Sequence, residues 1–372
     1  MTRRAQWAWC LFDFANSPFN TVVLTFLYAP FFAGRLAGEK AQGDAMWAFM
    51  FSASGVAIAL LAPFVGARAD RSAHKRRALV LSTAVVIACT ALLAVPSPDP
   101  VLGRASDAAL WTVLVLVAVA NVAFELAFVF YNAFLPQIAP PGQLGRLSGR
   151  GWACGYAGGL ACLVVCLGFV GIGGIGPWVS TERDFHVRAT MLVVAGWFLL
   201  FALPMFVLVR DRPPEPHAAQ APSVLHTLRG LPRQPALLRF LLAHLVYNDA
   251  LMGLIALAGL YMERTLHMGM GEILLTGVVL NVLAGGGALA FGRIDDRLGP
   301  RAVILASLGL LLGGGILAVA VPTRPAFWVA ASLIGIGMGP NQSASRTLLA
   351  RLAPVGRSAE YFGLFALSGK AT

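Results

Sequence analysis

The chain contains ten runs of predominantly apolar residues, and this pattern constrains its fold more than any other feature. With approximate boundaries the runs are Trp7–Phe32, Met46–Val65, Ala78–Val95, Leu110–Tyr131, Trp152–Val170, Ala189–Val209, Leu237–Leu260, Ile273–Phe291, Ala302–Val321 and Ala326–Met338. An eleventh begins near Tyr361. A helix needs about 20 apolar residues to cross a bilayer. The pattern therefore predicts an all-α integral membrane protein with about ten complete spans and the start of an eleventh.

The composition excludes a soluble protein. Apolar residues make up 58% of the chain and charged residues 12%, whereas a typical soluble domain has about 45–50% and about 25%. A soluble chain of 372 residues needs polar side chains to cover its surface, and this one has too few. The first apolar run is too long for a cleavable signal peptide, so we expect it to be a spanning helix.

Basic residues are distributed unevenly between the two sides of the predicted membrane. When loops are assigned to alternate sides, 20 of the 28 Lys and Arg residues fall on the side of the N-terminus and 7 on the other, with Lys370 inside the eleventh run. Short loops rich in Lys and Arg stay in the cytoplasm. We therefore expect a multi-pass protein of the inner cell membrane with a cytoplasmic N-terminus. The net charge of +11 is a topology signal, and we expect no nucleic-acid partner.

The chain repeats a loop sequence on the two sides of its longest polar stretch. Residues 66–77 read GARADRSAHKRR and residues 292–301 read GRIDDRLGPR. The matching residues are Gly66 with Gly292, Asp70 with Asp296 and Arg71 with Arg297. We predict an N-terminal six-helix half over residues 1–209, a cytoplasmic linker over 210–235 and an incomplete second half over 236–372. This arrangement resembles the duplicated architecture of the major facilitator superfamily.

The repeated loops are candidates for a conformational latch. A glycine permits close approach at a helix end, and an aspartate is stabilised at the N-terminus of a neighbouring helix. The predicted latch residues are Gly66, Asp70, Arg71, Arg76, Gly292, Asp296, Arg297 and Gly299. The alternative is that both loops are plain basic topology signals.

Polar residues inside the predicted spans mark a second candidate site. Ionisable groups are costly at membrane depth and are by default functional there. The polar residues concentrate in the first, fourth, seventh and tenth runs, which line the central cavity in the superfamily. The candidate substrate and coupling residues are Asp13, Asn16, Asn121, Glu125, His244, Asn248, Asp249, Asn341 and, in the eleventh run, Lys370.

Individual roles follow from predicted depth. Asp13 and Glu125 lie at similar depths, and two neighbouring carboxylates can share a proton, which raises one pKa into a range useful for coupling. Asp13 has the alternative of orienting the first span or pairing with a loop arginine, and His244 either relays protons or hydrogen-bonds a neighbour. Lys370 lies near the bilayer centre, where it needs an acid. We predict that Lys370 and Asp249 form an ion pair or together hold a zwitterionic cargo; the alternative is a purely structural Lys370.

Two further strings narrow the resemblance. They are WCLFDFANS at residues 9–17 and FGLFALSGKA at residues 362–371. With the loop at residues 66–77, they resemble the vacuole-effluxer-like family, also called the unknown major facilitator family, along the whole chain. The resemblance implies secondary transport, which in fungal vacuolar members is linked to amino-acid export. The positions that match the family pattern are Asp13, Asn16, Gly66, Asp70, Arg71 and Lys370.

We therefore expect a secondary active transporter that moves a small polar metabolite by alternating access. Amino acids are the leading cargo, with export and proton coupling; a sodium-coupled sugar or drug carrier is the alternative. The sequence lacks a Walker loop, an HExxH pattern and a catalytic constellation, so it is not expected to be an enzyme or an ATP-driven pump. We expect a monomer in the lipid bilayer, with no cofactor and no metal. Because the superfamily has twelve spans, we also expect this chain to be a fragment of a longer protein, or else a truncated form that does not transport.

Overall fold

The computed structural model describes residues 2–72, 74–171, 177–211 and 223–370, and within these ranges every regular element is a helix. The α-helices are α1 (Arg3–Pro18), α2 (Tyr28–Phe31), α3 (Lys40–Ser72), α4 (Lys75–Leu92), α5 (Asp107–Ala133), α6 (Leu135–Ile138), α7 (Leu144–Val170), α8 (Phe185–Leu208), α9 (Val224–Gly230), α10 (Pro235–Arg264), α11 (Met270–Leu298), α12 (Pro300–Ala320), α13 (Arg324–Leu352) and α14 (Ser358–Ser368). Two π-helical segments, η1 (Phe19–Phe26) and η2 (Phe32–Leu36), continue α1 as one apolar rod. The all-α membrane fold is confirmed. Part of the predicted linker, residues 212–222, lies outside the described residues.

Eight helices of the described chain are long and apolar enough to cross a bilayer. They are Arg3–Leu36, Lys40–Ser72, Asp107–Ile138, Leu144–Val170, Glu182–Leu208, Pro235–Arg264, Gly271–Leu298 and Pro300–Ala320. Two predicted spans, in α4 and α13, fall outside this set because of their polar ends. α4 begins with three basic residues, and α13 continues through a polar stretch to Leu352. Both helices nevertheless pack among the eight.

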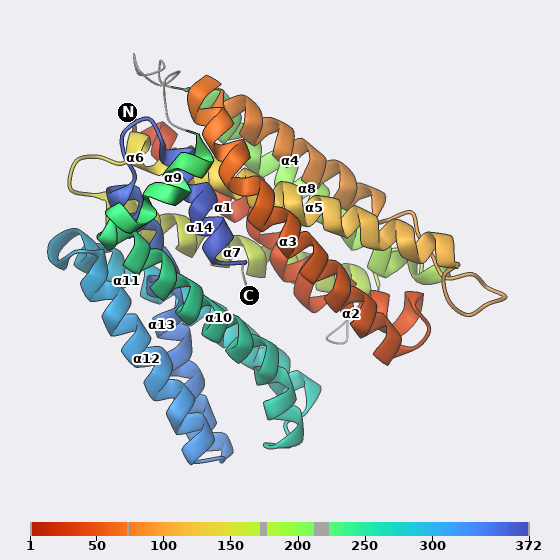
Figure 1. Ribbon diagram of the computed structural model, residues 1–372. Coiled ribbons are helices and arrows are strands. Elements are labelled where there is room, and N and C mark those ends of the chain that lie inside the picture. Colours follow the sequence, from red (N-terminus) through yellow and green to blue (C-terminus); the bar gives the residue numbers. More distant parts are fainter. Residues whose placement is uncertain (1, 73, 172–176, 212–222, 371–372) are drawn as a thin grey trace.

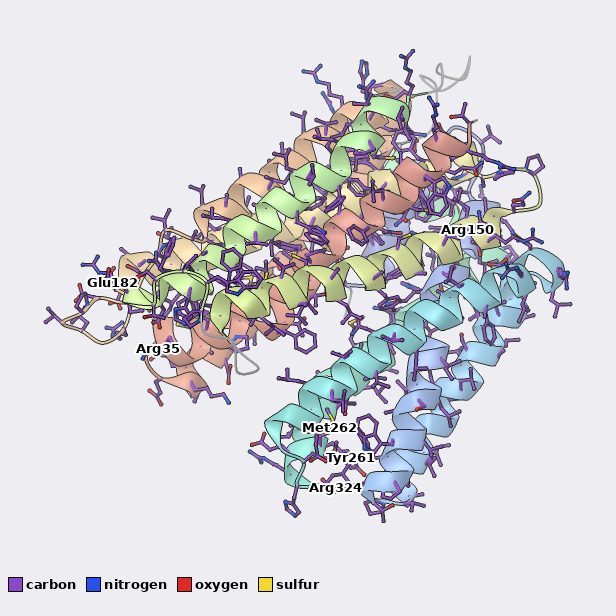
Figure 2. The ribbon with its side chains drawn as sticks, turned by 180° about the vertical axis from the view of Figure 1, so that it is seen from behind. Arg35, Arg150, Glu182, Tyr261, Met262 and Arg324 are labelled. Carbon is purple, nitrogen blue, oxygen red and sulfur yellow. The ribbon has the colours of Figure 1, made fainter. Side chains whose placement is uncertain are left out.

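The helices form two groups that meet at one face and diverge from it (Figure 1). Helices α1 to α8 lie together, α10 to α13 leave them at an angle, and α14 lies beside α3. We assign α14 to the second group because it follows α13 in the chain. We call the meeting end the N-terminal face, because the N-terminus, α6 and α9 lie there. Figure 2 shows the opposite ends apart: Arg35 and Glu182 lie at the far end of the first group and Arg324 at the far end of the second.

Close helix crossings join the two groups beside the N-terminal face. A Cβ atom at Gly66 of α3 would lie 2.2 Å from the carbonyl oxygen of Ala359 in α14. A Cβ atom at Gly149 of α7 would lie 2.3 Å from the carbonyl oxygen of Ala288 in α11. Because no side chain fits at either crossing, glycine is what lets the two backbones approach.

At the far ends, ion pairs join residues of the same group. Arg35 Nη2 lies 3.1 Å from Asp184 Oδ2 in the first group. Arg324 Nη1 lies 3.2 Å from Glu272 Oε1 in the second. These contacts stabilise each group separately and leave the groups free to diverge.

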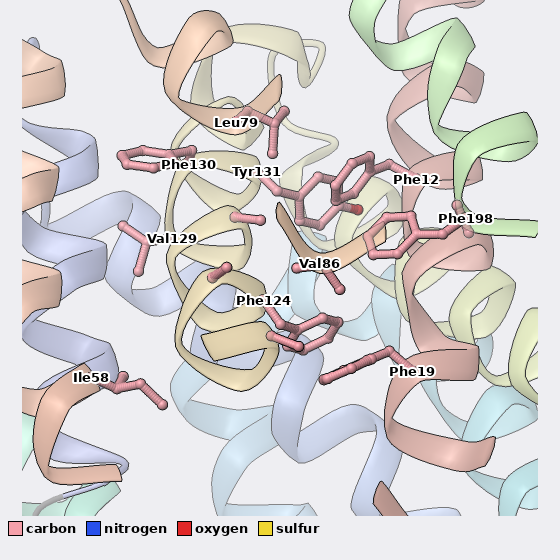
Figure 3. Close-up of a cluster of buried hydrophobic side chains, with 14 of the residues drawn as sticks. Phe12, Phe19, Ile58, Leu79, Val86, Phe124, Val129, Phe130, Tyr131 and Phe198 are labelled. Carbon is pink, nitrogen blue, oxygen red and sulfur yellow. The ribbon is translucent and has the colours of Figure 1, made fainter. Parts of the chain in front are cut away.

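An aromatic core fills the first group (Figure 3). Phe12 of α1 lies between Tyr131 of α5 and Phe198 of α8, with ring centroids 5.0 and 5.7 Å away. Aromatic pairs contribute about 0.5–1.5 kcal/mol each beyond their burial. They fix the rotation of α1, which carries Asp13 one residue after Phe12.

Candidate functional site

Arg346 of α13 inserts its side chain into the first helix group. Its Nη1 atom donates to Asp13 Oδ2 of α1 at 3.2 Å and to Asn132 Oδ1 of α5 at 3.3 Å. Its Nε and Nη2 atoms donate to the hydroxyl and the carbonyl oxygen of Ser148 in α7, at 2.9 and 2.6 Å. Three helices of the first group therefore hold one guanidinium of the second, and that side chain is 3% exposed.

Aromatic rings enclose the same guanidinium. Its central carbon lies 4.7 Å from the ring centroid of Trp9, 5.5 Å from that of Trp152 and 5.8 Å from that of Tyr131. Tyr131 also donates its hydroxyl to Asp13 Oδ2 at 2.7 Å. Cation–π contacts and hydrogen bonds offset the cost of burying both charges. We name Trp9, Asp13, Tyr131, Trp152 and Arg346 the gate cluster.

Close packing of α7 against α1 shapes this cluster. A Cβ atom at Gly151 of α7 would lie 2.6 Å from Asp13 Oδ2 and 2.7 Å from the Trp9 ring. Arg346 lies six residues before the end of α13 at Leu352, roughly 9 Å along the helix, so the cluster is close to the N-terminal face. Asn16, one turn beyond Asp13, is buried, and its Nδ2 atom has no hydrogen-bond partner among the described residues.

A second ion pair joins the groups deeper in the molecule. Lys370 Nζ lies 3.0 Å from Glu125 Oε1 of α5, and the two side chains are 27% and 19% exposed. His244 Nδ1 of α10 lies 2.9 Å from Ser368 Oγ. Asn248 Nδ2 donates to the carbonyl oxygen of Gly369 at 3.1 Å. Lys370 lies two residues after the end of α14 at Ser368. Measured along the helix axis, it is roughly 18 Å from the start of α14. We name Glu125, His244, Asn248, Ser368 and Lys370 the inner cluster.

The predicted ion pair between Lys370 and Asp249 is wrong. Lys370 pairs with Glu125, and Asp249 is exposed. Successive residues of an α-helix point about 100° apart. Because Asn248 faces α14, its neighbour Asp249 points away from it.

The structure also separates the two carboxylates that the sequence predicts to share a proton. Asp13 pairs with Arg346 and Glu125 with Lys370, so each acid has a cation of its own. The two side chains have similar predicted depths but point toward different helices. Asp13 faces α7 and α13, whereas Glu125 faces the end of α14.

The remaining predicted residues stabilise packing inside one group. Asn121 Nδ2 of α5 donates to Ser54 Oγ of α3 at 2.8 Å. Asn341 Nδ2 of α13 donates to Ser307 Oγ of α12 at 3.1 Å. Both amides are buried and lie in neither cluster.

The first repeated loop places an acid at a helix start of the other group. Asp70 Oδ2 accepts a hydrogen bond at 2.8 Å from the backbone N–H of Glu360, in the first turn of α14. Asp70 Oδ1 lies 2.7 Å from Lys75 Nζ. The cation that pairs with Asp70 is therefore Lys75, a residue of the same loop that was not among the predicted latch residues. The N–H of Arg76 donates instead to Asp211 at 3.1 Å, while burial raises the pKa of that carboxyl.

The second loop makes the corresponding contact in the opposite direction: its acid belongs to the second group and binds the start of a helix of the first group. Asp296 Oδ1 accepts a hydrogen bond at 2.7 Å from the N–H of Gly145, at the start of α7. A Cβ atom at Gly292 would lie 2.9 Å from the carbonyl oxygen of Gly145. Gly299 has a φ of +89°, which favours glycine there and allows the turn into α12. Arg297 is exposed.

Sequence reasoning missed most of the gate cluster. Arg346 lies beyond the apolar run that ends at Met338, so the hydropathy pattern places it in a loop. A usable signal was the helix-forming stretch between Pro340 and Leu352, which favours continuation of the helix. Trp9, Tyr131 and Trp152 carried no such signal, because apolar runs contain many aromatic residues.

A scan against protein families matches this chain to the family described as vacuole effluxer Atg22 like, over residues 32–143 and 142–372. An uncharacterized MFS-type transporter, YxiO of Bacillus subtilis, is 26% identical over 374 residues, which cover 98% of this chain and 84% of the relative. Autophagy-related protein 22 of Cryptococcus neoformans is 26% identical over 257 residues, 60% of this chain but only 43% of the fungal protein.

The fold is that of solved transporters. The proton:xylose symporter XylE superposes with a TM-score of 0.73 at 13% identity, over 99% of this chain and 86% of XylE. At this identity the likeness concerns the fold alone.

Proposed function

Because the chain belongs to the vacuole effluxer Atg22-like family of the major facilitator superfamily, we propose that it exports amino acids in exchange for protons. It is a multi-pass membrane transporter and not an enzyme. The family description supports export. The choice of amino acids as cargo rests on the paired charges of the inner cluster.

Transport proceeds by alternating access between residues 1–209 and residues 236–372, joined by the linker at 210–235. The two halves act as a monomer in the inner membrane, with the N-terminal face in the cytoplasm as the basic loops indicate. In the present structure that face is closed. Two hydrogen bonds join the halves there, from the start of α14 to Asp70 and from the start of α7 to Asp296, and we call these two contacts the caps. The glycine crossings join the halves at the same face. Breaking the caps at Asp70 and Asp296 opens it.

The single observation that carries the proposal is the Glu125–Lys370 pair. Its two charges come from opposite halves, lie 3.0 Å apart and are partly exposed. A zwitterionic amino acid replaces this pair with two matched contacts, because its ammonium group binds Glu125 and its carboxylate binds Lys370. After the cargo leaves, a proton binds Glu125 and releases Lys370 from it, and the next amino acid binds only when this proton has left on the cytoplasmic side. This alternation couples a proton to each amino acid.

Purified protein in proteoliposomes tests the proposal. Vesicles are loaded with a mixture of amino acids, and their loss is followed by mass spectrometry under a proton gradient, a sodium gradient or neither. We expect protein-dependent loss of amino acids that is faster with the proton gradient and abolished by a protonophore. Movement driven by sodium, or of sugars in place of amino acids in a parallel loading, would favour the sodium-coupled carrier instead.

A further inference from the structure

The two halves contribute unequally to the gate cluster. Arg346 is its sole contribution from the second half among the described residues, whereas the rings, the acid and the hydrogen-bond acceptors all belong to the first half. Opening of the N-terminal face moves α13 away from α1, α5 and α7. The guanidinium then leaves, and a pocket that is already shaped for it stays behind.

The vacated pocket needs a new cation. Asp13 is 3% exposed while Arg346 covers it, and it loses this ion-pair partner when Arg346 leaves. A carboxylate that is left without its cation in a largely apolar pocket is destabilised. The ring of Trp152, 5.5 Å from the central carbon of Arg346, loses its cation at the same time. The pocket thus offers one negative charge and aromatic faces to a cation.

We propose that Trp9, Asp13, Tyr131 and Trp152 bind the guanidinium side chain of a cationic amino acid, and that Arg346 is an internal competitor for this site. The inference rests on the proposed function, since it needs the halves to separate. It extends that function to the cargo class, which is amino acids of the arginine type.

The geometry favours a guanidinium over other cations. Arg346 shows that the pocket accepts a planar group, with its central carbon 4.7 Å from the Trp9 ring and hydrogen bonds to acceptors on Asp13, Asn132 and Ser148. A proton on Asp13 neutralises the acid but leaves the rings and the other acceptors without a partner.

The first test uses purified Arg346→Ala protein, in which the pocket is vacant. L-arginine is compared with L-citrulline, which has the same length but carries a neutral urea group, by titration calorimetry. We expect L-arginine to bind at least about tenfold more tightly, as one cation–π contact in a desolvated site supports. The Asp13→Asn/Arg346→Ala protein should lose this preference. Equal affinity for the two amino acids would overturn the proposal.

The second test leaves Arg346 in place. Ser343 is 3% exposed where α13 meets α7, so a Ser343→Cys protein reacts with a polar maleimide only when the N-terminal face opens. We expect L-arginine to raise the labelling rate several-fold and L-citrulline to leave it unchanged. Trp152→Leu in the same protein should abolish the increase. The parent protein, with its five native cysteines, provides the background.

The outcomes separate this inference from the proposed function. Labelling that rises equally with neutral amino acids, or with low pH alone, would overturn the guanidinium site and leave the transporter proposal intact. If no amino acid and no pH changes the labelling, alternating access itself fails. The titration of the vacant pocket still decides whether a guanidinium binds there.

Discussion

The gate cluster and the inner cluster each contain one ion pair between the halves, but they differ in environment. The Asp13–Arg346 pair has side-chain exposures of 5% and 3%, and the Glu125–Lys370 pair has 19% and 27%. Aromatic rings surround the first pair on several sides. Among the described residues, the second has one cation–π contact, between Lys370 Nζ and the ring of Phe51 at 5.8 Å.

This difference in exposure indicates different roles: the gate cluster holds the N-terminal face closed, and the inner cluster is accessible to a solute. A sealed pair holds two surfaces together, because breaking it leaves a buried charge without a partner. A partly exposed pair contributes little to stability but can be reached by a solute. We therefore expect the gate cluster to govern stability of the closed face and the inner cluster to govern transport.

The largest expected effect is on stability. Arg346→Ala should lower the free energy of unfolding by about 3–5 kcal/mol, because Asp13 is left buried without a cation. Lys370→Ala should lower it by less, because Glu125 is 19% exposed and is therefore partly solvated without its cation. Denaturant unfolding in mixed micelles measures both. Adding Asp13→Asn to Arg346→Ala should recover part of the loss, and similar losses for the two single variants would erase the contrast between the clusters.

The next effect concerns transport through the inner cluster. Glu125→Gln and Lys370→Ala should each slow amino-acid efflux by about tenfold or more, since a charged hydrogen bond contributes about 1.5–3 kcal/mol. The double variant should be no slower than the slower single variant. Asp249→Ala, on the exposed face of α10, is the matched control and should be near normal. Strictly additive losses would show that Glu125 and Lys370 act independently.

Overpacking at the crossings should shift the balance between open and closed faces. Gly66→Ala and Gly149→Ala place a methyl group against a carbonyl oxygen, which costs about 1–3 kcal/mol only while the face is closed. Labelling at the Ser343→Cys position should therefore become faster. Gly55→Ala is the control in α3, because nothing lies within 4 Å of its Cβ position. Equal labelling in the three variants would contradict the closed-face assignment.

The smallest effect should separate the two caps. Asp296→Asn removes a charge at a helix start, worth about 0.3–1 kcal/mol, and should slow transport a few-fold without impairing membrane insertion. Asp70→Asn removes a charge of the same kind and also leaves the buried Lys75 without its acid. Asp70→Asn should be the more severe, because its partner Lys75 is 9% exposed whereas Arg146, beside Asp296, is 37% exposed. Unchanged transport in both variants would reduce the loops to topology signals.

Much of the candidate site was within reach of the sequence. Asp13, Glu125 and Lys370 could be identified because they are ionisable residues inside apolar runs. Such residues are costly at membrane depth and are therefore by default functional. The repeated loops also located Asp70 and Asp296, since the same acid recurs at equivalent places. What could not be predicted is which acid meets which cation. That pairing depends on the rotation of each helix, and a single position along the chain turns a side chain by about 100°.

The sequence by itself determined the class of the protein, the positions of its helices and the residues that are costly to bury, because hydrophobic length and charge act locally along the chain. Only the tertiary structure decided the partners. Asp13 and Arg346 are 333 residues apart in the sequence, and they meet because Gly151 lets α7 approach α1 and because α13 continues beyond its apolar run. Lys370 meets Glu125 for the same kind of reason: Asn248 turns toward α14, which leaves Asp249 on the outside. Such contacts depend on how two helix groups pack against each other, and no local pattern of residues records that.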